Sequence, residues 1–330
     1  MSVVDGPYFD DLSVGDTFAA PAVTLDAGLQ AQHRAILGDR LRLCLDQPLA
    51  ERVTGRAGLA HPGVVWDVAI GQSSVVTRQV VANLFYRGLR LRAAPYLGDT
   101  LMTTTEIVAT RRVRSRPDRP ERGKAVLRIV TRDQTGRIIL SFDRCALLPC
   151  RGGAGPAGDV GPDVAGLFTA PPVPAEAAAP DWLAGWSLEP LLTGPREAPG
   201  RSPAAGDTFE LAAGDVVSSA PELARLTVNV AAVHHDAEAA GGRRLVYGGH
   251  TIGLALSQTC RMIPGLVTVT EWFACDHVAP VYEGDTVRSR VTVRGLTPYR
   301  DGSAIAVLNT RTSVAGRGTV LDWTFAGLVA

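Results

Sequence analysis

A polar cluster inside an otherwise apolar stretch is the part of this sequence best suited to chemistry. Asn229 and His234 lie five residues apart within residues 225–236, and His235 follows directly. Histidine suits proton transfer near neutral pH because its unperturbed pKa of about 6.5 lies close to the operating range. A side-chain amide can orient water but cannot accept a proton as a carboxylate does. We expect His234 to be an acid/base and Asn229 to orient water. A hydrogen-bonded core histidine and a backbone-capping amide are the competing interpretations.

A glycine pair leads into a second patterned region. Tyr247 and Gly248 precede residues 249–262, which begin with Gly249. In this range small or apolar side chains recur with the spacing of a helix that has one buried face: Ile252, Ala255, Leu256, Thr259 and Cys260. The first N–H groups of a helix have no partner within it, and the helix dipole favours negative charge there. We expect Gly248 or Gly249 to donate an N–H to an oxyanion, with a helix entry that simply needs small residues as the alternative. His250 is expected either to contact a substrate or to satisfy its own helical turn.

Composition excludes several classes of protein. The chain of 330 residues carries 33 Lys and Arg against 33 Asp and Glu, so it lacks the basic excess of nucleic-acid-binding proteins. Its length and hydrophobic content of 46% predict about two domains. Five cysteines, with no CxxC pair, predict a reduced, cytoplasmic protein without a metal cluster. The chain opens without a signal-like segment and has no apolar run of about 18 residues, which predicts no membrane association.

The tripeptide Gly-Asp-Thr occurs four times and indicates an internal repeat. It begins at Gly15, Gly98, Gly206 and Gly284. The first two lie 83 residues apart and the last two 78, while the offsets between the pairs are 191 and 186. This regularity predicts a duplicated unit of about 130 to 150 residues, in which a second Gly-Asp-Thr follows the central helix.

Each half is expected to contain one long helix followed by a meander of strands. Helices are predicted at 27–37, 62–76 and 249–262, and strands at 84–92, 101–113, 124–132, 137–148, 266–275, 285–294, 304–313 and 318–328. This order is an α+β plan in which each antiparallel sheet wraps its helix. Residues 151–200 are rich in Gly, Pro and Ala and are predicted to be a linker. Trp182, Trp186 and the Leu191-Leu192 pair predict that the second part of this linker lies against a domain surface.

The two halves resemble hotdog folds, and the whole chain resembles a tandem hotdog of the MaoC-like dehydratase family. The residues that carry the resemblance are 8–18, Pro95-Tyr96-Leu97-Gly98-Asp99-Thr100-Leu101, Arg244-Leu245-Val246-Tyr247-Gly248-Gly249-His250 and 280–286. It implies a double hotdog with an N-terminal hotdog over 1–150, the linker over 151–200 and a catalytic C-terminal hotdog over 201–330. It also implies that the halves behave as an internal dimer.

The resemblance also implies where the working site lies. Hydratases of this family carry Asp-x4-His, and the matching residues are Asn229 and His234, so the sequence departs from the family at the first position. The same spacing in the first half finds Asp39 and Cys44. That pair lacks an imidazole, and the N-terminal half is therefore expected to be non-catalytic.

The activity implied is reversible hydration of an enoyl thioester, with a short branched or dicarboxylic enoyl-CoA such as mesaconyl-CoA as substrate. His234, Asn229 and the glycine pair would be catalytic, and His235, Tyr247 and His250 would bind substrate. Arg87, Arg90 and Arg92 are candidates for the CoA phosphates, with solvated strand faces as the alternative. This reaction requires no metal or redox cofactor, and CoA enters as part of the substrate. The expected partner is a small acyl thioester, and homo-oligomerisation stays open.

Three other functions stay open at this point. They are a hotdog thioesterase, a non-catalytic acyl-CoA binder, and a specialised-metabolism dehydratase acting on a carrier-bound or non-thioester substrate. The last of these stays open because the sequence departs from the family pattern at Asn229 and at His235. Asp276 and His277 form an isolated acid/base dipeptide that we interpret as the polar end of a strand.

Overall fold

The strands of both halves form one continuous antiparallel sheet. The computed structural model describes residues 5–113, 120–152, 159–161, 164–193 and 203–330. Its sheet has thirteen strands, with the order β1-β4-β5-β6-β3-β10-β13-β12-β11-β8 along the main path. The strands are β1 (Thr17–Ala19), β2 (Val23–Thr24), β3 (Ala82–Leu91), β4 (Thr100–Arg112), β5 (Arg122–Arg132), β6 (Ile138–Pro149), β7 (Asp159–Val160), β8 (Thr208–Glu210), β9 (Asp215–Val216), β10 (Leu266–His277), β11 (Thr286–Pro298), β12 (Ala304–Val314) and β13 (Gly318–Val329).

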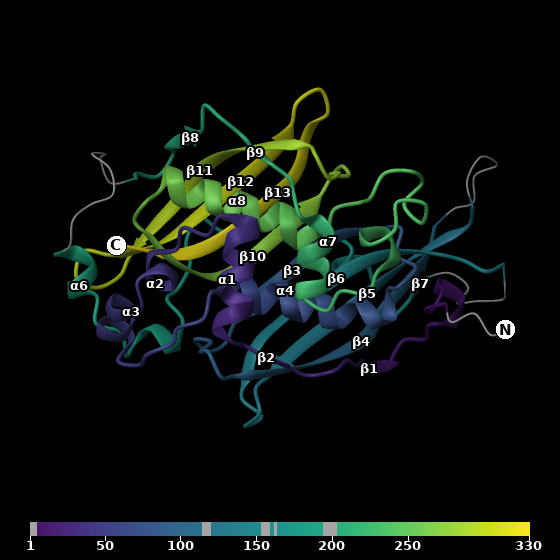
Figure 1. The fold of residues 1–330 in the computed structure, drawn as a ribbon, viewed down its shortest axis with the longest axis horizontal. Helices are drawn as coiled ribbons and strands as arrows, with labels where there is room; N and C mark the ends of the chain where they lie inside the picture. The colour runs from purple at the N-terminus through teal and green to yellow at the C-terminus, as the bar shows by residue number, and fades with distance from the viewer. Residues whose placement is uncertain (1–4, 114–119, 153–158, 162–163, 194–202) are drawn as a thin grey trace.

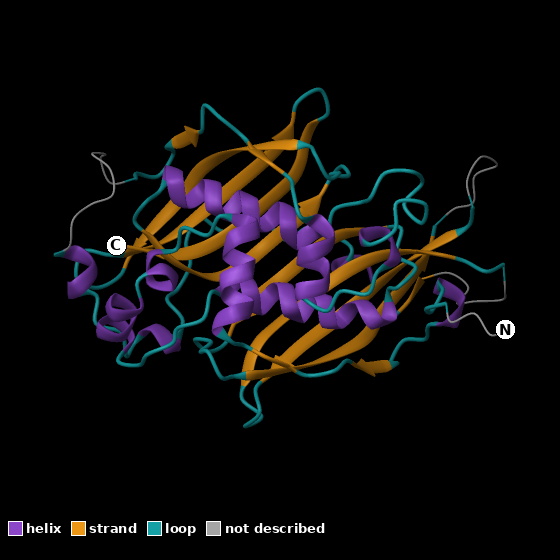
Figure 2. Ribbon diagram, viewed as in Figure 1, coloured by secondary structure: helices purple, strands orange, loops and turns teal. Residues whose placement is uncertain are grey.

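Four of the helices, α1, α4, α7 and α8, gather on one face of this sheet, as Figures 1 and 2 show. The two central helices, α4 and α8, contact one another there. The α-helices are α1 (Ala27–Leu37), α2 (Arg42–Leu45), α3 (Gln47–Thr54), α4 (Pro62–Gln72), α5 (Val164–Leu167), α6 (Glu189–Leu192), α7 (Ala220–Leu226) and α8 (Gly248–Met262). Short 3-10 turns are η1 (Phe9–Asp11), η2 (Ser73–Val76), η3 (Asp181–Leu183) and η4 (Ala232–His234).

The predicted long elements are confirmed. α1, α8 and the eight long strands lie at the predicted places, and α4 with η2 fills the predicted helix over 62–76. The α+β class and the double hotdog are therefore confirmed. The short helices α2, α3 and α7 were not predicted, because segments of four to eight residues carry too few positions to show a period.

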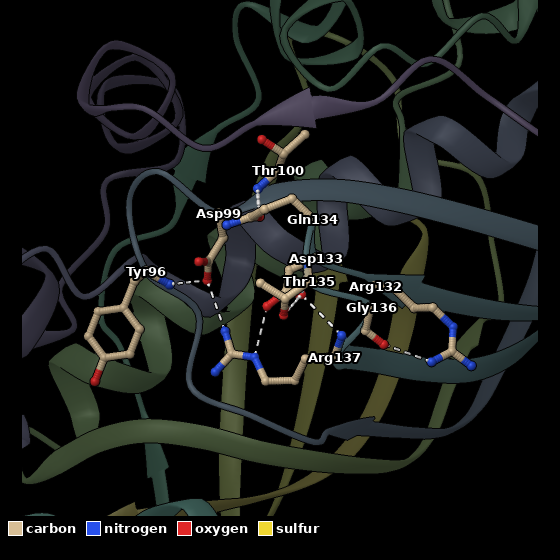
Figure 3. A network of polar contacts seen from close by, with 9 residues as sticks. All are labelled: Tyr96, Asp99, Thr100, Arg132, Asp133, Gln134, Thr135, Gly136 and Arg137. Carbon is tan, nitrogen blue, oxygen red and sulfur yellow. Dashed lines mark hydrogen bonds and ion pairs between the residues drawn. The ribbon is translucent and has the colours of Figure 1, made fainter.

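The four Gly-Asp-Thr repeats are structural turns at the starts of strands. Each glycine has a positive φ of 89° to 94°, which a residue with a Cβ rarely adopts. The aspartate after it accepts the backbone N–H three residues earlier, as Asp99 accepts from Tyr96 at 2.9 Å. Arg137 also reaches Asp99, at 3.3 Å (Figure 3). In the second half Arg317 pairs with Asp285 in the same way, so the duplication extends to side-chain contacts.

Three tryptophans from both halves pack together where β3 pairs with β10. Trp66 of α4 lies edge-on to Trp272 of β10, with ring centroids 4.9 Å apart, and Trp272 lies 5.2 Å from Trp323 of β13. All three side chains are fully buried. The helix of the first half therefore packs on strands of the second, and the main hydrophobic core includes residues of both halves.

The described part of the linker lies against the surface of both halves. Leu183 and Trp186 are buried, and the indole N–H of Trp182 donates to the carbonyl of Leu91 at 2.9 Å. This confirms the predicted surface contact, although Leu192 is exposed. The predicted boundary at 200/201 lies outside the described residues. Among the helices described, none is both long and apolar enough to span a bilayer.

Candidate active site

A cavity of about 650 Å³ lies between the two halves, beside the start of α8. The first half contributes to its wall Ile70, Ser74, Thr77, Tyr86 and Arg144. The second half contributes Asn229, His234, Tyr247, Gly248 and His277. The tertiary structure therefore brings the predicted imidazole, amide and helix start to one space large enough for a small acyl group.

His234 ends the 3-10 turn η4 and presents one ring nitrogen to the cavity. Its Nδ1 lies 2.8 Å from the carbonyl of Leu245, which has only lone pairs to offer, so Nδ1 carries the proton and donates. Nε2 is then an unprotonated acceptor. Burial lowers the pKa of His234 to about 4, and neighbouring His235 and Arg144 act in the same direction. The imidazole is therefore a neutral base at physiological pH.

Asn229 directs its amide N–H₂ away from the backbone. Its Oδ1 accepts the N–H of Ala231 at 3.0 Å, which assigns the oxygen and leaves Nδ2 free to donate to a ligand. The preceding Val228 has a φ of 53°, a left-handed conformation that β-branched residues rarely adopt. Such strain is concentrated at functional sites, where the surrounding structure holds it.

His235 holds the loop of residues 228–235 together and does not line the cavity. Its Nε2 donates to the carbonyl of Asn229 at 2.7 Å. His234 and His235 belong to a 3-10 turn and its cap, and the His235 ring is hydrogen-bonded to the backbone of this same loop. The prediction that His235 contacts substrate is therefore wrong. Its ring instead stabilises the loop through the hydrogen bond to Asn229.

The first half holds this loop in place. The N–H of Val230 donates to Ser74 Oγ at 2.8 Å, and the N–H of Ala232 donates to the carbonyl of Arg78 at 3.0 Å. Both acceptors lie in or just after η2, at the end of α4. The N-terminal half thus supports the candidate site even though it contributes neither the imidazole nor the amide.

The two glycines at the start of α8 have different surroundings. Gly248 lines the cavity, and a Cβ built there would lie 2.8 Å from Nε2 of His277 and 3.4 Å from the hydroxyl of Tyr86. Gly249 faces Asp67 of α4, where a Cβ would lie 2.0 Å from Oδ1. Of the two candidates for an oxyanion donor, Gly248 is the one that the cavity reaches.

Tyr247 and His250 have separate places in the site. The Tyr247 ring forms part of the cavity wall, and its hydroxyl donates to the backbone carbonyl of Asp67 at 2.8 Å. His250 is fully buried and does not line the cavity, and neither of its ring nitrogens has a partner among the described residues. Both interpretations offered for His250, a substrate contact and a self-satisfied turn, are therefore wrong.

Replacing His250 by valine is expected to stabilise the protein, most strongly in acid. Burial lowers the pKa of His250 to about 4. The unfolded chain therefore binds a proton near pH 6.5 while the folded chain does not, and stability is lost as pH falls from about 6.5 to 4. His250→Val should raise the free energy of unfolding by about 1–3 kcal/mol at neutral pH, since an unsatisfied buried polar group disappears. It should also reduce the acid slope by up to about 1.4 kcal/mol per pH unit.

Urea denaturation at several pH values measures both effects. The half-buried His235 should show no such gain, because His235→Val removes a hydrogen bond to the carbonyl of Asn229. An unchanged acid slope in His250→Val would contradict the assignment.

The three candidate phosphate-binding arginines lie outside the cavity wall. Arg87 pairs with Asp276 at 2.6 Å, Arg90 pairs with Glu271 at 3.2 Å, and Nε of Arg92 donates to Ser141 Oγ at 3.4 Å. They belong to β3 and the residue after it, and two of the three brace the junction with β10. Their positions favour the alternative interpretation, a strand face.

His277 lines the cavity, although its place in the sequence predicts only the polar end of a strand. It lies at the end of β10, its ring centroid is 5.8 Å from that of Tyr86, and its Nε2 has no partner among the described residues. Burial, with His234 nearby, lowers its pKa to about 4. The only sequence signal was a histidine at a predicted strand end, where polarity alone is common.

The equivalent place in the first half is closed. Asp39 lies 2.7 Å from Nε2 of His61, Cys44 is buried, and the cavity beside Asp39 and His61 holds only about 10 Å³. Asp39, Cys44 and His61 place ligand-type atoms within 4.8 Å of one another. However, Nδ1 of His61 accepts the N–H of Gly63 at 2.9 Å, so its Nε2 carries the proton and has no lone pair for a metal.

Comparisons with known proteins agree with this architecture. A solved structure of a conserved hypothetical protein from Mycobacterium tuberculosis, described as a double hotdog, superposes with a TM-score of 0.86 at 47% identity and 98% coverage of both chains. The chain belongs to this double-hotdog family. Solved MaoC-like dehydratases share the fold at lower identity, so the predicted resemblance is confirmed. No family model matches the chain.

Two curated enzymes are similar to this double-hotdog protein over most of its length. The β-methylmalyl-CoA dehydratase of Chloroflexus aurantiacus is 26% identical over 86% of this chain and 80% of its own. The mesaconyl-CoA hydratase of Cereibacter sphaeroides is 27% identical over 88% of this chain and 83% of its own.

Proposed function

We propose that this protein catalyses the reversible hydration of an enoyl-CoA in the cavity between its halves. The observation that carries the proposal is the convergence of a neutral His234 base, a free Asn229 amide and the start of α8 on one buried space. The names of the two curated enzymes support the reaction class and favour a short branched or dicarboxylic acyl group such as that of mesaconyl-CoA.

In the proposed mechanism His234 and Asn229 share the attacking water. The Asn229 N–H₂ donates to the water oxygen, and Nε2 of His234 accepts a water proton as the oxygen bonds to the β-carbon. The electron pair of the double bond moves to the thioester oxygen, where the Gly248 N–H and the dipole of α8 stabilise the enolate. The imidazolium then returns the proton to the α-carbon. Every step is a proton transfer or an addition, so the proposal includes no metal or redox cofactor.

Incubation with mesaconyl-CoA and crotonyl-CoA tests this proposal directly. We expect enoyl absorbance to fall and the product mass to rise by one water. Release of free thiol without a hydrated product would identify a thioesterase instead. A shift in melting temperature with CoA esters but no turnover would identify a non-catalytic binder. Inactivity on both CoA esters together with turnover of a carrier-bound enoyl group would favour the specialised-metabolism alternative.

Asn229→Asp is expected to retain or increase hydration and to introduce a new pH dependence. An aspartate can keep the acceptor for the Ala231 N–H and adds a carboxylate at a position only 4% exposed. Burial raises the pKa of a carboxyl group, so activity that depends on its charged form falls as pH drops through that raised value. The pH profile of kcat/KM, compared with wild type, measures this limb. Asn229→Leu is the control and should lose activity at every pH.

A further inference from the structure

The catalytic cavity carries positive charge without a compensating acid. Its wall includes Arg144 and Arg122, and no aspartate or glutamate belongs to it among the described residues. The start of α8 adds the positive end of a helix dipole. A space with this charge favours an anionic ligand.

Arg144 is the unusual member of this pair because it is buried. Only 4% of its surface is exposed, and its donors meet neutral oxygens: Ser73 Oγ at 2.9 Å, Thr77 Oγ1 at 2.6 Å and, more weakly, the carbonyl of Ile70 at 3.5 Å. Its Nε has no acceptor, and no carboxylate is among the hydrogen-bond partners of its guanidinium in the described part of the chain. A buried charge without an opposite charge is costly, so an unpaired guanidinium here requires a reason.

Arg144 also lies at the reacting end of the cavity. In the sheet it stands directly opposite Tyr86, whose hydroxyl is close to Gly248. Its positive charge also helps to lower the pKa of His234. A group that binds Arg144 is therefore part of the acyl moiety near the double bond. A CoA phosphate, which remains hydrated, suits so buried a position poorly.

We propose that Arg144 binds a carboxylate carried by the acyl group of the substrate, so that the enzyme selects enoyl thioesters with a second, free carboxyl group. The inference rests on the proposed hydration of enoyl thioesters in this cavity. A guanidinium can bind a carboxylate through two parallel hydrogen bonds, which adds orientation as well as affinity. Arg144 would thereby hold the β-carbon in a fixed place relative to His234.

The test compares mesaconyl-CoA with 2-methylcrotonyl-CoA, in which a methyl group replaces the free carboxylate. Wild type should prefer mesaconyl-CoA in kcat/KM. Arg144→Met should lose about 10²- to 10³-fold on mesaconyl-CoA, because a buried carboxylate is left without its partner, and should change by only a few-fold on the methyl analogue. Arg144→Lys keeps the positive charge but cannot form the two parallel hydrogen bonds of a guanidinium. Its kcat/KM on mesaconyl-CoA should lie between those of wild type and Arg144→Met.

Arg122→Met is the matched control, since Arg122 lines the same cavity but is only partly buried. It should leave the preference between the two esters unchanged. Equal losses on both esters in the Arg144 variants would overturn the proposal and show that Arg144 only ties α4 to β6. A lost preference in Arg122→Met would overturn it as well.

Binding measurements separate this proposal from the hydration itself. Calorimetry with both esters on wild type and Arg144→Lys reports carboxylate recognition even if neither ester is turned over. Tighter binding of mesaconyl-CoA than of its methyl analogue, weakened by Arg144→Lys, would support the carboxylate site in the absence of hydration. Equal affinity of wild type for the two esters would overturn the proposal whatever the activity.

Discussion

Replacing His234 by alanine is expected to lower kcat by about 10²- to 10⁴-fold while leaving substrate binding nearly intact. The imidazole is placed by one hydrogen bond, from Nδ1 to the carbonyl of Leu245, and among the described residues no hydrogen-bond partner of its Nε2 would be lost. Its removal therefore takes away the proton acceptor without disturbing the helix start at Gly248. Steady-state kinetics with mesaconyl-CoA measure the effect, and KM should change by no more than a few-fold.

The pH profile of wild-type kcat/KM also tests the role of His234 as the base. Because burial lowers the pKa of His234 to about 4, its base form is complete above about pH 5 and disappears as pH falls through 4. The acid limb of kcat/KM should accordingly lie near pH 4 instead of near 6.5. Loss of this limb in His234→Ala would identify its origin.

Cys44→Ala is the control in the first half. Cys44 occupies the position that matches His234 in the repeat, but burial raises the pKa of its thiol well above the usual value. Turnover should stay within about two-fold of wild type. A fully active His234→Ala, or an inactive Cys44→Ala, would show that the working site is not in the second half.

Gly248→Ala is expected to lower kcat/KM by about 10²- to 10³-fold without loss of stability. The added Cβ would lie 2.8 Å from Nε2 of His277, in the space next to the proposed oxyanion donor. The His277 ring must move, and the thioester oxygen loses its access to the N–H. Alanine is a better helix former than glycine, so the melting temperature should stay the same or rise. Activity and thermal unfolding, measured together, test this separation.

Gly249→Ala is the matched variant with the opposite outcome. Its Cβ would meet Oδ1 of Asp67 at 2.0 Å, and Asp67 is fully buried and held by His33 at 2.9 Å. Since neither side can move, we expect a loss of about 3 kcal/mol or more, or failure to fold. A stable Gly249→Ala, or an unstable but otherwise active Gly248→Ala, would contradict the different roles assigned to the two glycines.

Local information in the sequence was enough for the repeat and for the long elements. Each of the four Gly-Asp-Thr turns needs a glycine with a positive φ and a hydrogen bond to the aspartate from the N–H three residues earlier. Both requirements are local, so the sequence pattern alone reveals the turns. The helices α4 and α8 and the long strands have enough positions to show a period. His234, Asn229 and Gly248 were found because they are polar or strand-breaking residues in apolar surroundings.

The rest of the site was decided by contacts between distant segments. His277 and Arg144 enter the cavity only because β10 pairs with β3 and β3 pairs with β6, a register that no local pattern records. Arg144 does occupy an inward position on β6, between buried Phe142 and Ala146, so strand alternation carried a signal for it. Gly249 and His250 point to α4 and the core because of how α8 crosses the neighbouring helix. A sequence pattern specifies which face of an element is buried, whereas the partner on that face is chosen by the packing of the whole chain.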